Sequence, residues 1–535
     1  MKSFWPLALL LSASSAAGAP ARIGFDSQTL LKHRLRGETR VVGRAGDEPT
    51  FSGIPVIVSI SPEGDVTSAR VDRDENDEDA DPALALAAAR RWKFRPFRYR
   101  GTAVAAQGVI SIDYRPAPKW RNPTAKLPAI DYSNLEISLA RSNCFGDCPD
   151  YDVTIRGDGT VEFNNRALPW EEGVERRKFS PGRGVLIPGR HLSRIERPAL
   201  DSLIEKFRAA HFFGLERKYS ARITDNPTYI LSFRTGGRAW TVTDYVGDRA
   251  GMPAVVTRLE DAIDAAAGTS RWVSGDESTV AALKAEGFDF GSAEAAELAA
   301  AAAGWRESPE AVIIGLLDSG VSPDRMMPAE GALPQASLGE RLLVAAIGQH
   351  RPRLFDWLAS RGWLGRVSRE RLSTAFAEGA GGCDPAVARA LVAAGADPKA
   401  GTARTVGSGQ IKGASALMSA VTAYGPCRGL PLDALVAELA GLGVDPNAVD
   451  SDGRNALYLV EDPDLQERLL ALGVRADVHD TMGRSAVFTA WSDRTVLGLL
   501  DAGADPRGLF SDGKTLRRER GMPAVSAWLE EHGID

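Results

Sequence analysis

Cysteine and histidine are scarce in this chain, which has four cysteines and six histidines among 535 residues. No cysteine precedes Cys144, which excludes a lipid-modified cysteine at the amino terminus. The sequence also lacks a G-x-S-x-G nucleophile elbow, an H-E-x-x-H helix and the clustered cysteines of a zinc site. We therefore expect no catalytic residue, no cofactor and no metal ion, and we expect that the protein is not an enzyme.

Strong net charge and long apolar runs are lacking as well. The formal net charge of −6 is small for 535 residues, so no nucleic-acid partner is expected. The apolar run from Phe4 to Leu11 follows Lys2 and leads into small residues up to Ala21; it is shorter than the ~20 residues that a spanning helix needs. This pattern predicts a cleaved signal peptide over residues 1–21, with an uncleaved anchor as the alternative. We expect a periplasmic or secreted protein without a membrane span.

The carboxy-terminal half does contain a repeated phrase, in which a leucine-rich run ends in glycine, as in LVAAGADP, LAGLGVDP and LLDAGADP. The aligned glycines are Gly287, Gly320, Gly362, Gly395, Gly443, Gly473, Gly503 and Gly533. Spacings of 33 residues (287 to 320) and 30 residues (473 to 503) recur, and 48 residues (395 to 443) indicate an insertion. A period near 33 with two helices per unit resembles the ankyrin repeat. We expect about seven such repeats, some degenerate, over residues 276–535.

Local signals within these repeats predict where helices end and begin. Gly395, Gly443 and Gly503 are expected to adopt the left-handed conformation that stops a helix, because glycine has no side chain to oppose it. Asn455–Leu457 and Ser485–Val487 are expected to open the next helices. Since one repeat cannot bury its own apolar face, the repeats must stack into an all-α solenoid.

Before the repeats lies a compact block over residues 53–116. Alternating apolar residues on both sides of Pro62–Asp65 predict a β-hairpin, Pro82 opens a helix, and residues 107–114 read as another strand. The run Trp92-Lys93-Phe94-Arg95-Pro96 after the helix resembles the carboxy-terminal domain of TonB-type energy transducers. The resemblance implies a small α+β module whose edge strand pairs with a receptor peptide. Residues 22–52 form a separate amino-terminal segment, with an amphipathic piece from Ser27 to Arg36.

Two charged runs in this block allow further interpretations. The acidic run Asp72–Asp79 has part of the spacing of a calcium loop but lacks its glycine and its twelfth position, so we expect a solvated loop. The run Arg90–Arg100 alternates basic and aromatic residues, as a nucleic-acid surface does. We expect instead a strand with a charged outer face, and contact with anionic envelope polymers is the alternative.

Residues 131–268 read as a second α+β domain, joined to the first by an exposed, proline-rich linker over residues 117–130. Strands are expected near residues 135–139, 151–155 and 161–163, and a hairpin around Gly236-Gly237. The motif C-F-G-x-C-P at residues 144–149 resembles a bacterial domain family of unknown function that occurs in exported proteins. The resemblance implies no particular activity.

The four cysteines fall into two pairs in different domains. Cys144 and Cys148 could be a metal pair, a redox pair or a local disulfide, and their position between two strands favours the disulfide. Cys383 and Cys427 both lie between the first and second helices of their repeats. We expect a disulfide between them, with two unpaired thiols as the alternative.

Other polar residues offer no catalytic constellation. The aspartates beside turns are expected to bond to the local backbone; they are Asp147, Asp150, Asp158, Asp225 and Asp244. His191 and His211 have no fixed partner by spacing.

The predicted architecture is therefore multidomain, with two small α+β domains followed by an all-α ankyrin-type solenoid. We expect an exported, non-enzymatic protein-binding or scaffold protein that acts through the concave repeat surface. The alternatives are an envelope hydrolase with its site in the middle domain and an inhibitor or immunity factor.

Overall fold

The computed structural model describes residues 22–25, 27–44, 53–72, 82–99, 101–146, 148–165, 184–329, 335–402, 412–422, 425–490, 492–510, 513, 515–516 and 522–534. The expected signal peptide, most of the acidic run Asp72–Asp79, and Asp147 lie outside these residues. Within the described ranges, no helix has both the length and the apolar character that crossing a bilayer requires.

The amino-terminal body is built on a five-stranded sheet. Strands β4 (Ile54–Ile60) and β5 (Val66–Val71) form the expected hairpin, and β9 (Ala106–Arg115) pairs with β4 in antiparallel fashion. Helix α2 (Pro82–Ala89) packs on the hairpin. Val56, Val58 and Ile60 are fully buried, because alternate strand residues face the same side of a sheet.

The segment before this hairpin completes the sheet instead of forming a separate unit. Strands β1 (Ile23–Gly24) and β3 (Arg40–Val42) both pair with β9 in parallel. Helix α1 (Ser27–His33), which lies between β1 and β3 in the sequence, packs against β9. The amphipathic piece expected up to Arg36 is helical only to His33, because Arg34–Arg36 form β2 and pair with β6 (Lys93–Phe94).

The basic and aromatic run at residues 90–100 is a strand region with a charged outer face, as predicted. Trp92, Phe94 and Phe97 are buried in the core, whereas Arg95 and Arg98 are exposed. Strands β7 (Phe97–Tyr99) and β8 (Thr102–Val104) form a small hairpin here. Three of the aromatic side chains therefore belong to the interior, whereas Tyr99 is half-buried.

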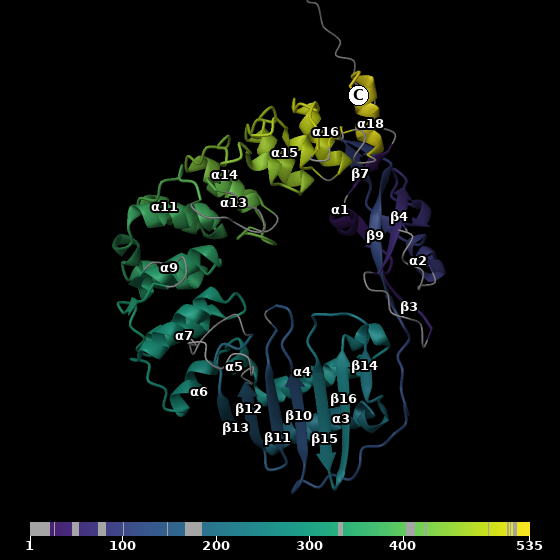
Figure 1. Ribbon diagram of the computed structural model, residues 1–535, viewed down its shortest axis with the longest axis vertical. Helices are drawn as coiled ribbons and strands as arrows, with labels where there is room; N and C mark the ends of the chain where they lie inside the picture. The colour runs from purple at the N-terminus through teal and green to yellow at the C-terminus, as the bar shows by residue number, and fades with distance from the viewer. Residues whose placement is uncertain are drawn as a thin grey trace, which may run out of the picture.

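The middle body holds a seven-stranded sheet in the order β13-β12-β11-β10-β15-β16-β14. The strands are β10 (Glu136–Arg141), β11 (Tyr151–Arg156), β12 (Thr160–Asn165), β13 (Arg190–Arg194), β14 (Lys218–Ser220), β15 (Tyr229–Thr235) and β16 (Arg238–Tyr245). Helices α3 (Arg197–Ala209) and α4 (Val255–Ala267) pack together over one face of it (Figure 1). The predicted strands and hairpin are all present, and β13 and β14 were not predicted.

The linker over residues 117–130, expected to be exposed, is attached to the middle body. The Lys119 amide donates to the carbonyl oxygen of Gly251 at 2.7 Å, and the Asn122 amide donates to that of Gly214 at 2.8 Å. The Tyr219 hydroxyl donates to the Lys119 carbonyl at 2.8 Å. The proline-rich composition predicted an extended backbone, but the unpaired amides of that backbone bond to the neighbouring loops.

The carboxy-terminal half is helical, and its helices follow one another in an arc (Figure 1). The first part of the arc contains α5 (Ser270–Val273), α6 (Thr279–Ala285), α7 (Ala293–Gly304), α8 (Glu310–Asp318), α9 (Leu338–Gly348) and α10 (Pro352–Ser360). The second part contains α11 (Arg369–Glu378), α12 (Pro385–Ala393), α13 (Ala416–Val421), α14 (Asp433–Gly441), α15 (Pro463–Ala471), α16 (Asp493–Asp501) and α18 (Pro523–Glu531).

The predicted left-handed glycines are confirmed. Gly395, Gly443 and Gly503 have φ values of 103°, 94° and 93°. After α12, the Gly395 amide donates to the carbonyl of Val392 and the Ala396 amide to that of Leu391. This is the Schellman arrangement, which satisfies the last carbonyl groups of a helix.

The helices predicted to open at Asn455 and Ser485 are only single 3₁₀ turns, η7 (Ala456–Tyr458) and η8 (Ala486–Phe488). Their repeats span 30 residues, three fewer than the units of 33. Asp462 and Ser492 already cap the following helices. The shorter repeat therefore leaves too few residues for a full first helix.

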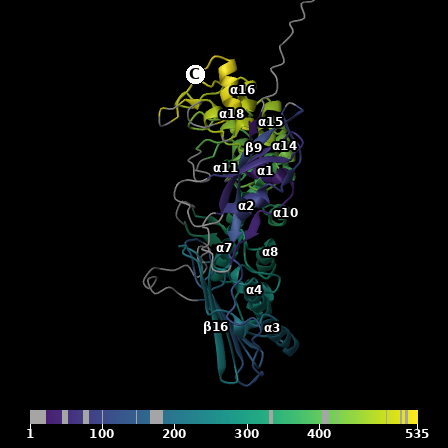
Figure 2. The ribbon, with the colours of Figure 1, turned by 90° about the vertical axis from the view of Figure 1, so that its right-hand side faces the viewer.

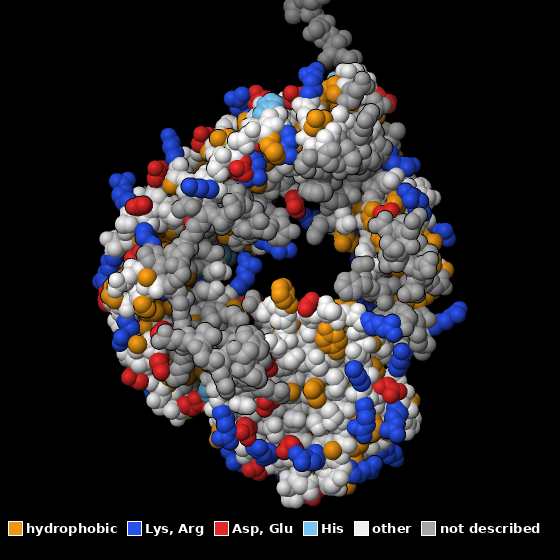
Figure 3. Space-filling view, viewed as in Figure 1, with side chains coloured by type: hydrophobic (Ala, Val, Ile, Leu, Met, Phe, Trp, Pro, Cys, Tyr) orange, Lys and Arg blue, Asp and Glu red, His pale blue; other side chains and the backbone are white. Residues whose placement is uncertain are grey.

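The three parts close into a ring, because the last helices return to the amino-terminal sheet. Figure 1 places α18 beside β7, and β1 contacts both α16 and α18. The space-filling view shows an opening through the middle of the molecule (Figure 3). Seen from the side, the ring is flat (Figure 2). The middle sheet, the helical arc and the amino-terminal sheet all contribute to its inner rim.

Candidate functional site

Both cysteine pairs are disulfides in the structure. Cys144 and Cys148 are joined in the loop between β10 and β11, with their Cα atoms 5.5 Å apart. Cys383 and Cys427 join the turn after α11 to the turn after α13, with a Cα separation of 5.3 Å. No thiol is therefore left as a nucleophile or metal ligand.

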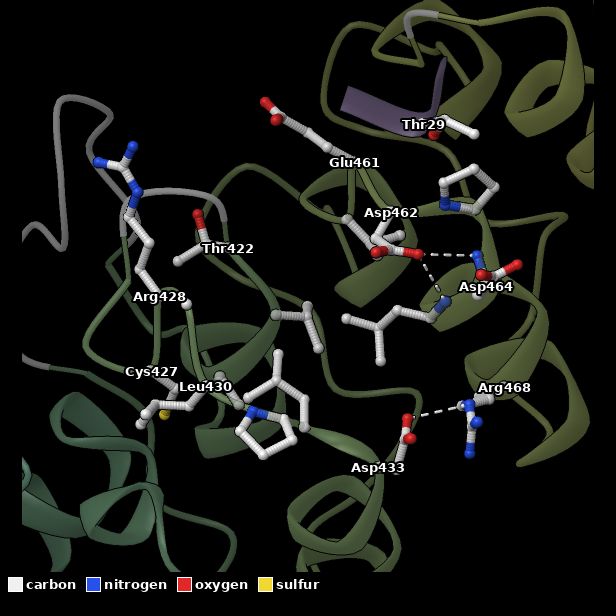
Figure 4. Close-up of a pocket in the computed structure, with 18 of the residues that line it drawn as sticks. Thr29, Thr422, Cys427, Arg428, Leu430, Asp433, Glu461, Asp462, Asp464 and Arg468 are labelled. Atoms are coloured by element: carbon white, nitrogen blue, oxygen red, sulfur yellow. Dashed lines mark hydrogen bonds and ion pairs between the residues drawn. The ribbon is translucent and has the colours of Figure 1, made fainter. Parts of the chain in front are cut away.

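A cavity of about 1040 Å³ lies on the inner side of the arc, between α1 and the beginnings of α14, α15 and α16. The close-up shows Thr422, Arg428 and Leu430 on one side of the cavity and Thr29 and Asp462 on the other (Figure 4). Both polar and apolar side chains thus line it. Cys427 also lines the cavity, so the second disulfide supports one of its walls.

Two ion pairs mark the cavity wall. The Lys32 ammonium lies 2.9 Å from a carboxylate oxygen of Asp462. The Arg468 guanidinium lies 3.0 Å from Asp433 (Figure 4). Lys32 belongs to α1, while its partner precedes α15 in the helical arc. The wall therefore carries charges of both signs, and α1 supplies part of it.

Asp462 lies at the start of α15, and the helix holds its side chain in place. As the residue before Pro463 it caps the helix, accepting the amides of Asp464 at 2.9 Å and Leu465 at 3.3 Å. Burial opposes its charge, but the Lys32 ammonium and these amides outweigh burial and hold the pKa of Asp462 below its ordinary value. The carboxylate is thus charged at neutral pH, and both of its oxygens are engaged, one by Lys32 and one by the helix amides.

The described residues that line the cavity include no histidine, and their cysteine is in a disulfide. Hydroxyl groups are present on Ser27, Thr29, Thr422, Ser492 and Thr495. The carboxylates of Asp433, Glu461, Asp462 and Asp464 line the same cavity. The arrangement is suited to recognition by hydrogen bonds and ion pairs.

A buried acidic pair in the middle body was missed from the sequence, where only Asp244 attracted notice. Asp244 at the end of β16 and Glu260 on α4 are 6% and 3% exposed. The Gly247 amide donates to Asp244 at 2.6 Å, in keeping with the local turn contact expected for this aspartate. Burial, reinforced by the charge of Asp244, raises the pKa of Glu260 from 4.5 to about 8.

This pair holds a proton at neutral pH and lies next to a further network. The Arg141 guanidinium pairs with Asp264, and the Tyr151 hydroxyl donates to the same carboxylate at 2.6 Å. Together these groups fasten α4 to the ends of β10 and β11. Because both acids are almost fully buried, the geometry supports helix packing more directly than contact with a substrate. Acidic residues at i and i+4 beside the apolar face of α4, here Glu260 and Asp264, are the signal that could have revealed these groups.

The other polar residues noted in the sequence are spread over the middle body. His191 stacks on Trp272 with ring centres 3.9 Å apart and lies 3.0 Å from Glu286. His211 bonds to the carbonyl oxygen of Ala125 at 3.0 Å. Asp158 accepts the amide of Thr160 in a turn at 2.9 Å, as expected. Asp150 is buried at 8% exposure, and Asp225 has a φ of 66°.

The described part of the chain contains no cluster of three or more histidine, cysteine, aspartate or glutamate residues that could hold a metal ion. The structure therefore does not gather the residues noted in the sequence into one centre.

Residues 508–515 (GLFSDGKT) have the spacing of a phosphate-binding loop, a match missed from the sequence. Such a loop follows a strand and opens a helix, whereas this stretch follows α16. Gly513 has a φ of 80°, close to the 77° of Gly453 and the 73° of Gly483. Ser511, Asp512 and Lys514 lie outside the described residues. Gly453, Gly483 and Gly513 thus share a left-handed conformation at turn tips 30 residues apart.

Comparison with known families covers the first two bodies. Residues 54–116 match the family described as Gram-negative bacterial TonB protein C-terminal. Residues 135–267 match a domain of unknown function, DUF6438. No ankyrin-repeat family model matches the carboxy-terminal half, and no curated protein matches the chain. The chain is thus similar to these two families in its amino-terminal and middle parts and continues into a helical carboxy-terminal half.

Proposed function

We propose that this protein is an exported, non-enzymatic binding or scaffold protein of the bacterial envelope. Its partner is a protein, held on the inner surface of an ankyrin-type helical array. The cavity of about 1040 Å³ between α1 and the starts of α14 to α16 carries this proposal. It is lined by charged, hydroxyl and apolar side chains, a mixture typical of protein recognition surfaces.

An ankyrin-type array is supported by features that recur from repeat to repeat. Asp450 accepts the amides of Asp452 and Arg454, and Asp480, 30 residues later, accepts those of Met482 and Arg484. The guanidinium groups of Arg454 and Arg484 pair with the same two aspartates. These matching tips indicate one structural unit used repeatedly.

Contacts between neighbouring tips are those of a stacked array. The Thr481 amide donates to the carbonyl of Asp452 at 2.8 Å, and the Ser451 amide to that of Lys412 at 2.8 Å. Buried Asn455 and Ser485 donate to the carbonyls of Arg475 and Asp505 in the following units. Each unit is therefore stabilised mainly by its neighbour, as in solenoid proteins.

A place in the envelope is supported by two observations. The amino-terminal body matches a domain of Gram-negative bacterial envelope proteins. The four cysteines form two disulfides, which persist mainly in oxidising compartments. Both agree with an extracytoplasmic protein and with the signal peptide expected from residues 1–21.

Site-specific photocrosslinking in living cells tests the function. A photoreactive amino acid placed at Glu461, in the cavity, is expected to capture one protein reproducibly. The matched control at Leu472, a partly exposed residue just beyond the end of α15, is expected to capture none. The same capture should fall at least about tenfold when Arg468→Glu reverses a charge of the wall. Equal labelling from both positions, or none from Glu461, would contradict the proposal.

A further inference from the structure

Three polar contacts join the amino-terminal body to the last helices, beside the packing of β1 on α16 and α18. The Gly24 amide donates to Asp493 at 2.6 Å, the Lys32 ammonium pairs with Asp462 at 2.9 Å, and the Tyr99 hydroxyl donates to Asp501 at 2.5 Å. The partners are 402 to 469 residues apart in the sequence. We call these six residues the clasp.

Asp493 is the centre of the clasp. Asp493 is only 1% exposed. Its carboxylate accepts hydrogen bonds from the backbone amides of Gly24, at 2.6 Å, and of Val525 in α18, at 3.2 Å. One carboxylate thus joins β1 to both final helices. If the ring opens, water replaces the Gly24 amide at this carboxylate, while the Val525 contact stays within the helical part.

The other end of the helical arc is attached in a different way. Trp272 and Leu186 are 2% and 1% exposed, and the amides of Leu186 and Ile187 donate to the carbonyls of Val273 and Trp272 at 2.8 and 2.9 Å. This junction is apolar, hydrogen-bonded through the backbone and continuous in the chain. At the clasp β1 packs on α16 and α18 around the buried Asp493, but two of the three polar contacts lie at the surface, and the Lys32 side chain is 65% exposed. Exposed ion pairs contribute little free energy and weaken with salt.

The clasp also borders the cavity described above, which Lys32 and Asp462 both line. Ser27, Thr29 and Lys32 of α1 form part of the cavity wall. Moving the amino-terminal body away from α15 and α16 therefore removes that wall and exposes the starts of these helices.

From these contacts we infer that the clasp is a reversible gate: its release opens the ring and admits a protein segment to the cavity. The inference rests on the proposed function, because the cavity is the partner site. It predicts an equilibrium between a closed ring and an open arc, with the Trp272 junction as the hinge. Partner binding favours the open form, since the partner takes the place of α1.

A covalent lock provides a test. A Cβ atom built on Gly24 would lie 3.7 Å from the Cβ atom of Asp493, within the 3.5–4.5 Å found across disulfides. The double variant Gly24→Cys with Asp493→Cys should therefore bridge the clasp, and a nonreduced digest should contain the linkage between positions 24 and 493. The native cysteines are already paired.

Small-angle X-ray scattering of the purified full chain measures whether the ring is open or closed in the absence of any partner. The opening variant Lys32→Glu with Tyr99→Phe is expected to increase the maximum dimension, and raised salt should shift the wild type in the same direction. Adding the lock to the opening variant should restore the closed profile. Arg475→Glu, which breaks a surface pair with Asp477 outside the clasp, is the charge-matched control and should scatter as the wild type. Identical profiles for the opening and locked variants, each with a wild-type circular dichroism spectrum, would overturn the gate.

Photocrosslinking from Glu461 distinguishes the gate from the proposed function. The locked ring is expected to lose capture of the partner by at least about tenfold relative to the wild type. Undiminished capture by the locked ring would overturn the gate and leave the proposed function standing. Absence of capture in every variant would overturn the proposed function, while scattering would still decide whether the clasp opens.

Discussion

Glycines that end the helices adopt a backbone conformation that other residues reach only at a cost. Gly443 has a φ of 94°, and a Cβ atom there would meet only Pro398, at 3.9 Å. Gly441 lies two residues earlier, within α14, and a Cβ atom there would meet nothing within 4 Å. The two positions therefore differ in backbone conformation far more than in available space.

We expect Gly443→Ala to destabilise the helical region by about 1 kcal/mol, because the left-handed conformation opposes a side chain. Gly441→Ala should instead stabilise it by up to about 1 kcal/mol, since alanine favours the helix. Denaturant midpoints of both variants measure the difference. Equal shifts would mean that the left-handed glycine has no special role.

The buried acid Glu260 makes stability depend on pH. Its pKa is about 8 in the folded protein, against an ordinary value of 4.5. Between these values the folded state binds a proton that the unfolded state releases, so stability falls as pH rises from about 5 to about 8. Thermal melts of Glu260→Gln, which stays neutral, should show less than half of this dependence. The exposed Glu277→Gln is the control and should leave the slope unchanged.

At the scale of elements, the two disulfides differ in the chain that they close. Cys383 and Cys427 are 44 residues apart and join neighbouring helical units, whereas Cys144 and Cys148 are four apart within one loop. Closing the longer loop removes more entropy from the unfolded chain, about 4 kcal/mol against about 2 kcal/mol in the chain-entropy model. The longer bridge also supports the cavity wall through Cys427.

Replacing Cys383 and Cys427 together by alanine should therefore lower the free energy of unfolding more than replacing Cys144 and Cys148. Chemical denaturation under nonreducing conditions measures both losses. We expect the first variant also to lose crosslinking from Glu461, and the second to keep it. A larger loss from the short loop would show that local strain, and not loop closure, dominates.

At the scale of the whole molecule, the junction at Trp272 couples the middle body to the helices. Trp272 is buried and stacks on His191, which also bonds to Glu286 after α6. Trp272→Ala should cost about 3 to 5 kcal/mol at this junction, as truncation of buried aromatic residues does. We expect calorimetry to resolve two transitions where the wild type shows one cooperative transition. An unchanged single transition would contradict the coupling.

Part of the cavity could be anticipated and part could not. Asp462 followed by Pro463 predicts the start of a helix, because aspartate favours the N-cap position and proline favours the first position of a helix. The partner of Asp462, Lys32, lies 430 residues away. Nothing near either residue in the sequence indicates the contact. The spacing of acidic residues on α4 could have drawn attention to Glu260, but it does not indicate that Asp244 is its neighbour. Pairing across a sheet or a ring depends on how whole elements are placed.

By itself, the sequence determined the local structure: the alternating strands, the helices that end at left-handed glycines, and the even pairing of cysteines. These features follow from interactions among residues a few positions apart, where backbone sterics and burial patterns act directly. Only the tertiary structure decided that β1 and β3 complete the first sheet and that the chain closes into a ring. The closure brings the carboxylate of Asp493 to the amide of Gly24, 469 residues away, and such a contact depends on the placement of every element between them.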